Sequence, residues 1–502
     1  MRLRTLVRGS LFYTVGNFLP RIGAFLLLPI YTAAMAPAEF GTFSLMLSIA
    51  GVLGIVYRFG LDGALMRLHF DVEERDRPSL YLTLSVVTAA IGLVLSVLLG
   101  LIAVPTFSRL FAGTPFWPFA PLTLILTFLL SFQYVPSSWF RARELPGRFL
   151  LLTVVSFAGG LVGTVLFVLV LDGGAVGALL GQIGAAGTAA AATIVVLVSL
   201  GAAAFRADFL RRALTFGLPL LPHSLSAWVL NVSDRWLIGL LVVGGAAAAQ
   251  TAIGVYSFGY LLGQVVGLVA FSFNAAWVPF FYQRGAGPQG PRLLREMTTL
   301  SIAGLAVLAA GIGLLAPELA TALAGDQWGD AIEDAARITP IVAVASVAYG
   351  LYFMVVSPVF MERRTAVLPA LTIAAGLLNV GLNLVLIPTV GIVGAAWATL
   401  AGYAALAGLT TWYARRIYAL ALDVGKLAAI GTGLVTLLAA GTLLTEPIAG
   451  TPVGAVAHVA LAAAFAGLMA WLAWGAIGRL RLAVAEDGGA GAGIMAAPKG
   501  NP

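Results

Sequence analysis

The sequence contains no cysteine, which excludes a disulfide scaffold, a thiolate metal site and a cysteine nucleophile. Charged residues make up only 10% of the 502 residues. There is no G-x-x-x-x-G-K-[ST] phosphate loop, and no polar connection is long enough for a nucleotide-binding domain, so ATP hydrolysis within this chain is excluded. No cluster has metal-ligand spacing and no Ser/His/Asp constellation is present. We therefore predict no metal site, no cofactor and no catalytic residue.

Apolar residues dominate what remains. They form 60% of the chain, and the mean hydropathy is +1.00. This composition is typical of an all-α polytopic membrane protein, because open strands cannot cross lipid. Since a membrane-spanning helix needs about 20 residues, the apolar runs predict fourteen transmembrane helices, over 10–34, 41–65, 80–104, 116–136, 149–171, 175–200, 213–243, 251–282, 297–316, 337–361, 365–388, 392–414, 427–445 and 453–478.

The distribution of positive charge supports this number of helices. With the N-terminus in the cytoplasm, the connections on the cytoplasmic side carry 23 of the 28 basic residues. Both termini are therefore predicted to be cytoplasmic, and the net charge of +7 reflects topology rather than nucleic-acid binding. The run 11–35 is too long for a removed signal peptide and is predicted to be the first helix, and residues 483–502 are predicted to be a disordered cytoplasmic tail.

Three short patterns indicate an internal duplication. Gly41, in the predicted loop 39–44 after the first helix, corresponds to Gly254 in the predicted loop 252–257 after the seventh, 213 residues later. The turns 175–178 and 392–395, and the segments 140–143 and 360–363, repeat at similar offsets. Two parallel six-helix repeats are expected to form two lobes around a central substrate cavity, over 1–205 and 206–418, with two extra helices in 419–482.

Five charged residues lie within the predicted spans: Arg21, Arg58, Asp62, Asp234 and Arg235. Facing lipid unpaired, they would together cost about 15 kcal/mol. They are therefore expected to face protein or a water-filled cavity, and the excess of arginine favours an anionic cargo. Asp62 and Asp234 are the candidate ion-coupling acids.

Each of these charges also has a structural interpretation. Arg21 either holds a diphosphate or pairs with an acid such as Asp234. Arg58 and Asp62 are four residues apart, so they either neutralise each other or line the cavity. Asp234 and Arg235 point in different directions on a helix, which allows coupling by Asp234 and substrate contact by Arg235. In the alternative, both fix helices seven and eight together.

Amides and a histidine add further candidates within the spans. Asn231 and Asn274 are interpreted as sugar contacts, with helix packing as the alternative. Asn379 and Asn383 form one polar stripe on the eleventh helix, for which packing is the expected role and sugar contact the alternative. Prolines 219 and 222 predict a bend in the seventh helix beside His223, which either packs or carries a proton.

The segments 28–32, 40–44, 231–236 and 254–257 together resemble the polysaccharide-export flippases of the multidrug/oligosaccharidyl-lipid/polysaccharide superfamily, in particular the Wzx-like O-antigen flippases. The resemblance implies two six-helix lobes and a secondary transporter that flips a lipid-diphosphate-linked oligosaccharide across the bacterial inner membrane. It also places Arg21 and Arg58 at the phosphate.

The partners implied by this resemblance are a polyprenyl-diphosphate-linked glycan, membrane lipid, H+ or Na+ as coupling ion, and a polysaccharide polymerase or export machinery. Two alternatives remain open. A multidrug cation antiporter of the same superfamily would need a more acidic cavity, and a membrane-embedded polymerase or ligase would need a larger outer loop than residues 317–336.

Overall fold

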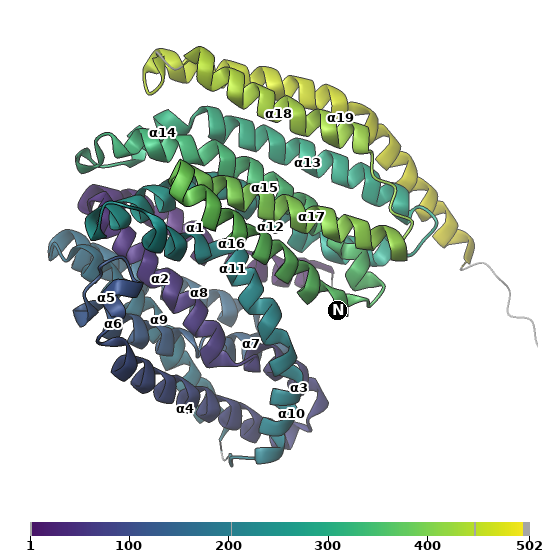
Figure 1. The fold of residues 1–502 in the computed structure, drawn as a ribbon. Helices are drawn as coiled ribbons and strands as arrows, with labels where there is room; N and C mark the ends of the chain where they lie inside the picture. The colour runs from purple at the N-terminus through teal and green to yellow at the C-terminus, as the bar shows by residue number, and fades with distance from the viewer. Residues whose placement is uncertain (1–2, 202, 446–447, 495–502) are drawn as a thin grey trace, which may run out of the picture. The chain divides into compact units, whose positions relative to one another are not determined.

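The computed structural model describes residues 3–201, 203–445 and 448–494, and in this part of the chain all regular structure is helical. Fourteen stretches of the described residues are long and apolar enough to cross a membrane, which confirms the predicted number. The α-helices (Figure 1) are α1 (Leu3–Ala34), α2 (Pro37–Arg58), α3 (Leu61–Asp71), α4 (Arg77–Ala103), α5 (Phe107–Leu110), α6 (Phe116–Leu130), α7 (Tyr134–Ala142), α8 (Pro146–Thr164), α9 (Gly174–Leu200), α10 (Ala207–Gly217), α11 (Leu221–Leu241), α12 (Ala246–Arg284), α13 (Gly290–Leu314), α14 (Ala316–Leu323), α15 (Ala331–Met361), α16 (Leu368–Val390), α17 (Ile392–Ile417), α18 (Val424–Thr445) and α19 (Pro452–Ile494).

Several spans predicted as single helices are interrupted. The second consists of α2 and α3, because Phe59 and Gly60 adopt left-handed conformations with φ of 51° and 75°. The fourth consists of α6 and α7, and the fifth ends in a π-helical turn at Val165–Val170. The seventh is divided into α10 and α11 by a 3-10 turn at Leu218–Leu220. That break lies at the predicted prolines, which cannot donate a backbone hydrogen bond.

The two segments predicted as loops around Gly41 and Gly254 are helical instead. Residues 39–44 lie in the first turns of α2 and residues 252–257 lie in α12. The predicted turns 175–178 and 392–395 are likewise the first turns of α9 and α17. The prediction was wrong because glycine here does not mark a turn; it permits close contact between helices.

That contact is reciprocal. A Cβ atom on Gly41 would overlap the carbonyl oxygen of Gln250 and lie 2.8 Å from the nitrogen of Gly254. A Cβ atom on Gly254 would overlap the carbonyl oxygen of Pro37 and lie 3.0 Å from the nitrogen of Gly41. Pro37 and Gln250 are themselves 213 residues apart. Equivalent residues that contact each other in exchanged roles are what a two-fold relation produces, so this crossing supports the duplication.

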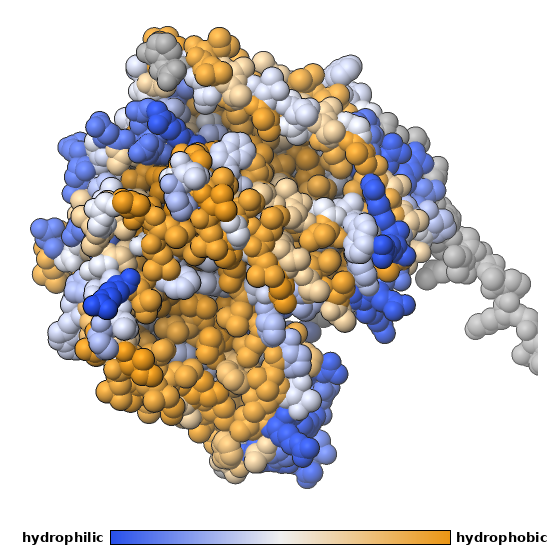
Figure 2. Space-filling view, viewed as in Figure 1, coloured by the Kyte–Doolittle hydropathy of each residue, from blue (hydrophilic) through white to orange (hydrophobic). Residues whose placement is uncertain are grey.

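The chain divides into two compact units, each described here by itself. The first contains residues 1–258, 323–334 and 379–395. Its core joins buried side chains of α3, α4, α7, α9 and α10. The surface of α4 seen in Figure 2 is almost wholly hydrophobic, with hydrophilic residues gathered near α3 and α10. The lobes proposed from the duplication follow different boundaries and stay a prediction.

Within this first unit, a short connection between α14 and α15 packs against the C-terminal end of α1. The Trp328 ring of the 3-10 turn Asp326–Trp328 is buried, and it packs at a tilt against Phe258 with a centroid distance of 4.9 Å. The indole Nε1 of Trp328 donates to the carbonyl oxygens of Thr32 (3.0 Å) and Met35 (3.1 Å). These carbonyls lie at the C-terminal end of α1, where four such groups lack a partner within the helix.

The second unit contains residues 259–322, 335–378 and 396–502. Its core lies among α12, α13, α15, α18 and α19 and is rich in alanine, so that helices approach closely. The last helix, α19, continues to Ile494, and the disordered tail expected from residue 483 stays a prediction. Alanine, which favours helices, recurs there. Residues 495–502 of that predicted tail lie outside the described residues.

Candidate functional site

Arg58 and Asp62 face each other across the break between α2 and α3. The Arg58 Nε lies 3.6 Å from Asp62 Oδ2, which confirms the predicted pairing although the helix between them is not continuous. Arg58 is the last residue of α2 and Asp62 the second of α3. A cation at a helix C-terminus and an anion at a helix N-terminus are both stabilised by the helix dipoles.

The two members of this pair differ in accessibility and bonding. The Asp62 side chain is 48% exposed and its Oδ1 accepts the Gly63 N–H at 2.9 Å. The Arg58 side chain is 27% exposed, and its Nε is buried without a hydrogen bond, because 3.6 Å is too long for one. The guanidinium is therefore paired with Asp62 electrostatically, and its Nε makes no hydrogen bond.

A second interrupted helix crosses the chain at this break. A Cβ atom on Gly60 would overlap the backbone of Gly217, and one on Gly217 would lie 2.5 Å from the Gly60 carbonyl oxygen. Gly217 is the last residue of α10, immediately before the 3-10 turn that leads into α11. Two broken helices thus meet backbone to backbone beside Arg58. Discontinuous helices that expose backbone groups are a recurring feature of substrate and ion sites in secondary transporters.

Asp234 is completely buried and belongs to a polar network. The Tyr256 hydroxyl donates to Asp234 Oδ2 at 2.6 Å, and the Asn383 Nδ2 donates to Asp234 Oδ1 at 2.9 Å. Asn383 also donates to the Asn379 carbonyl oxygen (3.0 Å) and side-chain Oδ1 (3.2 Å). The network therefore joins α11, α12 and α16 within the first unit.

Within the part of the chain that the structure describes, two amide atoms of this network make no hydrogen bond. They are the Nδ2 of Asn379 and the Oδ1 of Asn383, both of them buried. Such atoms are costly in a protein interior unless they bind water or a ligand. The site presents carboxylate and amide oxygens, the type of ligand that hard cations prefer.

Arg235 contacts the same tyrosine from another direction. Its guanidinium carbon lies 5.7 Å from the centre of the Tyr256 ring, and its side chain is only 9% exposed. Asp234 and Arg235 point apart, as expected for neighbours on a helix. Both still reach Tyr256, because Asp234 accepts a hydrogen bond from the tyrosine hydroxyl and Arg235 lies over the tyrosine ring. This geometry supports the structural alternative in which Asp234 and Arg235 fix helices seven and eight together.

The remaining sequence candidates lie elsewhere. Arg21 is exposed on α1. Asn231 is partly buried, and its Nδ2 donates to the carbonyl oxygen of Ala227 on its own helix at 2.6 Å. Asn274 belongs to the second unit and has a buried Oδ1 without a hydrogen-bond partner. Their predicted contacts with substrate stay predictions.

The role of Tyr256 was not predicted, and Asn383 was expected to pack, with sugar contact as the alternative. Tyr256 was used as part of the repeated pattern 254–257, and nothing in that pattern shows that its hydroxyl meets an acid. The polar stripe of Asn379 and Asn383 was visible in the sequence, but which charge it faces depends on the packing of α16 against α11. His223 Nδ1 is buried and makes no hydrogen bond within the described part of the chain.

Comparison with known proteins places this arrangement in context. Residues 6–284, more than half of the chain, match the family described as polysaccharide biosynthesis protein. No curated protein matches the sequence. Among solved structures, the lipid II flippase MurJ in an inward closed conformation has a TM-score of 0.68, with 14% identity over 92% of this chain and 98% of that chain.

Multidrug transporters share the same fold. An inward-facing multidrug resistance MATE family transporter of the MOP superfamily has a TM-score of 0.57, with 16% identity over 82% of this chain and 96% of that chain. A variant of the Vibrio cholerae MATE transporter VcmN has a TM-score of 0.55, with 15% identity over the same shares. The chain is therefore a multi-pass membrane protein of the polysaccharide biosynthesis protein family, with the fold of MOP superfamily transporters.

Proposed function

We propose that this protein is a secondary transporter that flips a lipid-diphosphate-linked oligosaccharide across the bacterial inner membrane by alternating access. The observation that carries the proposal is the family match over residues 6–284, combined with the fold likeness to a lipid II flippase. The anionic cargo agrees with the arginine excess among the intramembrane charges. The lipid tail stays in the bilayer while the sugar headgroup passes through the protein.

In this proposal Arg58 contacts the diphosphate. Its Nε is buried and makes no hydrogen bond, and its only described ion pair is with a half-exposed carboxylate at 3.6 Å. A guanidinium binds phosphate oxygens through paired hydrogen bonds that an ammonium cannot reproduce. Arg21, exposed on α1, is the second phosphate contact of the proposal. Arg235 is assigned to holding α11 against Tyr256 instead.

Ion coupling is assigned to the network of Asp234, Asn379 and Asn383. The Asp234 side chain is fully buried, and because a charged residue in a membrane span is costly, such residues often mark sites that bind H+ or Na+. The buried Oδ1 of Asn383 makes no hydrogen bond among the described residues and would add an oxygen ligand for such a cation. Asp62 is assigned to pairing with Arg58 rather than to coupling.

The test is reconstitution in vesicles with a lipid-diphosphate-linked oligosaccharide, followed by the exposure of its headgroup to an enzyme outside the vesicle. We expect transport to fall at least about tenfold in Arg58→Gln, the loss expected when a charge-assisted hydrogen bond is removed. Arg67→Gln is the matched control, because Arg67 pairs with Asp71 at the same distance of 3.6 Å and spacing but is 63% exposed. Equal transport by the two variants would refute phosphate binding by Arg58.

The same vesicle assay distinguishes the proposed flippase from the two alternative functions. A cationic drug that moves while the lipid-linked sugar does not would favour the antiporter, whose fold this chain shares. Glycan transfer to an acceptor without headgroup movement would favour a polymerase or ligase. Asp234→Asn should abolish the dependence on a Na+ or H+ gradient, and an unchanged dependence would remove Asp234 from the coupling mechanism.

A further inference from the structure

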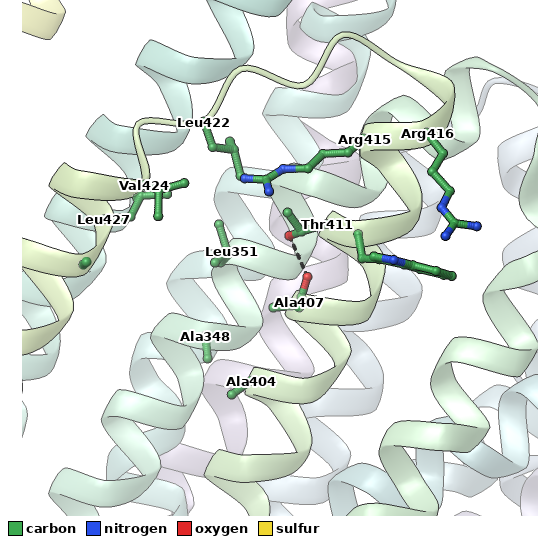
Figure 3. A pocket seen from close by; sticks show the side chains of 13 residues that line it. Ala348, Leu351, Ala404, Ala407, Thr411, Arg415, Arg416, Leu422, Val424 and Leu427 are labelled. Carbon is green, nitrogen blue, oxygen red and sulfur yellow. Dashed lines mark hydrogen bonds between the residues drawn. The ribbon is translucent and has the colours of Figure 1, made fainter.

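A cavity of about 630 Å³ opens between α15, α17 and α18 of the second unit (Figure 3). This volume lies within the range of about 300–1,000 Å³ that ligand pockets have. Its lining is mostly small or aliphatic, and arginine occurs at one end only. The lining residues are Ala348, Leu351, Ala404, Ala407, Gly408, Thr411, Trp412, Arg415, Arg416, Leu422, Val424, Leu427 and Ala428.

The lining follows one face of α17. Ala404, Ala407, Thr411 and Arg415 are spaced by three or four residues, which places them on the same side of a helix. At 1.5 Å per residue, this face is roughly 16 Å long. That is about half of the 30 Å hydrocarbon core of a bilayer, and therefore about the depth of one lipid leaflet.

The interior of the cavity offers no free polar group along α17. The Thr411 hydroxyl donates to the Ala407 carbonyl oxygen at 2.7 Å, so it is satisfied within its own helix. Gly408 faces open space, since a Cβ atom built there has no neighbour within 4 Å. The shape and chemistry of this part of the cavity suit an acyl chain.

The charged end of the cavity carries an excess of cations. Arg415 extends across the mouth toward Leu422, whereas Arg416 turns away and lies 3.8 Å from the centre of the Trp412 ring (Figure 3). Asp423, in the connection that follows α17, is already engaged by the side chains of Arg295 (3.2 Å) and Lys426 (3.3 Å).

That acid remains ionised and so does not neutralise Arg415. Burial raises the pKa of the Asp423 carboxyl, but hydrogen bonds from the Lys426 backbone and from the Arg295 and Lys426 side chains lower it further, and the net pKa is below its usual value. Its single negative charge is shared by two cations. Arg415 is therefore the cation at the mouth that is available to an anion entering from the membrane surface.

We propose that this cavity binds an anionic glycerophospholipid of the adjacent leaflet, with its phosphate on Arg415 and one acyl chain along α17. The lipid is a bound component of the transporter and not its cargo, so the proposal does not depend on which molecule is flipped. The positive charges at this end are predicted to be cytoplasmic, where anionic lipids attract arginine and lysine. Basic pockets between membrane helices on that side commonly hold such headgroups.

The depth of the cavity selects this occupant over a polyprenyl chain. An acyl chain fills one leaflet, as the apolar face from Ala404 to Arg415 does. The phosphodiester of phosphatidylglycerol carries a net negative charge, and that of phosphatidylcholine is offset by its choline. A site that depends on Arg415 should therefore distinguish these two lipids.

The experiment measures lipid retained by the purified full-length protein, by native mass spectrometry, after mixing with phosphatidylglycerol or phosphatidylcholine of identical acyl chains. We expect wild-type protein to prefer phosphatidylglycerol, and Arg415→Gln to weaken its binding about tenfold. Arg416→Gln is the matched control, because that side chain lies over Trp412. Equal binding of the two lipids, or equal effects of the two substitutions, would overturn the proposal.

A second pair of variants tests the apolar part of the site. Gly408→Leu should fill the groove and displace phosphatidylglycerol, whereas Gly431→Leu, on α18, should not, although a Cβ atom at either glycine meets nothing within 4 Å. Size-exclusion profiles check that each variant is folded. If Gly408→Leu retains the lipid, or if polyprenyl phosphate binds and phosphatidylglycerol does not, the proposed occupant is wrong.

Discussion

The strength of the hydrogen bond from Tyr256 to Asp234 depends on whether the buried carboxylate is ionised, and it can be measured. Its oxygen-to-oxygen distance is 2.6 Å, within the range of about 2.5–2.7 Å for bonds from a hydroxyl to a charged acceptor. Tyr256→Phe removes the donor and leaves the ring in place. Asp234→Asn keeps the shape of the side chain and removes its charge. The double variant completes a thermodynamic cycle that isolates the interaction between them.

The expected size of the coupling follows from the state of Asp234. Hydrogen bonds between side chains in membrane proteins contribute about 0.6 kcal/mol on average in such cycles, because polar groups also find partners in the unfolded state. A hydrogen bond to a charged group contributes about 1.5–3 kcal/mol. Since Asp234 is fully buried and Asn383 Nδ2 also donates to it, we expect a coupling free energy of about 2 kcal/mol, near the middle of the charged range.

The assay is reversible unfolding of the four proteins in mixed micelles, followed by the change in tryptophan fluorescence. A coupling free energy of about 2 kcal/mol would be a roughly thirtyfold departure from additivity in the unfolding equilibrium constant. Additive effects, or a coupling near 0.6 kcal/mol, would show that the bond is ordinary and would refute an ionised Asp234. Repeating the cycle at several Na+ concentrations separates binding of Na+ from binding of a proton.

Three further predictions concern backbone contacts and the buried indole. Gly41→Ala should destabilise the protein by about 1–3 kcal/mol, as overpacking does, because the new Cβ would overlap the Gln250 backbone. Gly54→Ala is the control and should not destabilise it, because a Cβ atom there meets nothing within 4 Å. Equal thermal midpoints for the two variants would contradict the close crossing at Gly41. Gly60→Ala should destabilise similarly, because it adds a side chain at φ 75° against another helix, and wild-type stability would contradict this close approach. Trp328→Ala should lower the free energy of unfolding by about 3–5 kcal/mol, since the ring is 2% exposed and its Nε1 makes two hydrogen bonds. A loss of less than about 1 kcal/mol in the same unfolding assay would show that this turn is dispensable for stability.

The number and kind of helices could be predicted from the sequence, but their interruptions could not all be predicted. Hydropathy and length decide whether a segment crosses the membrane, and these are properties of the sequence alone. The break in the seventh span was visible because prolines occur there. The break at Phe59 and Gly60 was hidden, since phenylalanine seldom adopts a left-handed conformation and glycine is tolerated within membrane helices.

Individual candidate residues could be proposed from the sequence, but which of them lie together could not. The pair Arg58 and Asp62 was found because four residues on a helix define a short distance. Asp234 and Asn383 are 149 residues apart and meet only through the packing of two helices. The sequence shows that each of these residues is costly in a membrane span. It does not show which of them form hydrogen bonds with one another.

The reciprocal crossing of Gly41 and Gly254 relates the predicted duplication to the candidate ion site. A two-fold relation brings equivalent residues together only near its axis, and the carbonyls over which these glycines pass belong to the equivalent residues Pro37 and Gln250. Tyr256 follows this crossing on α12 by two residues and holds Asp234. Its equivalent at the same offset is Phe43, which has no hydroxyl. Under the predicted duplication, the two repeats share their crossing but not this hydrogen bond, so the proposed ion-coupling network is expected to be a property of one repeat alone.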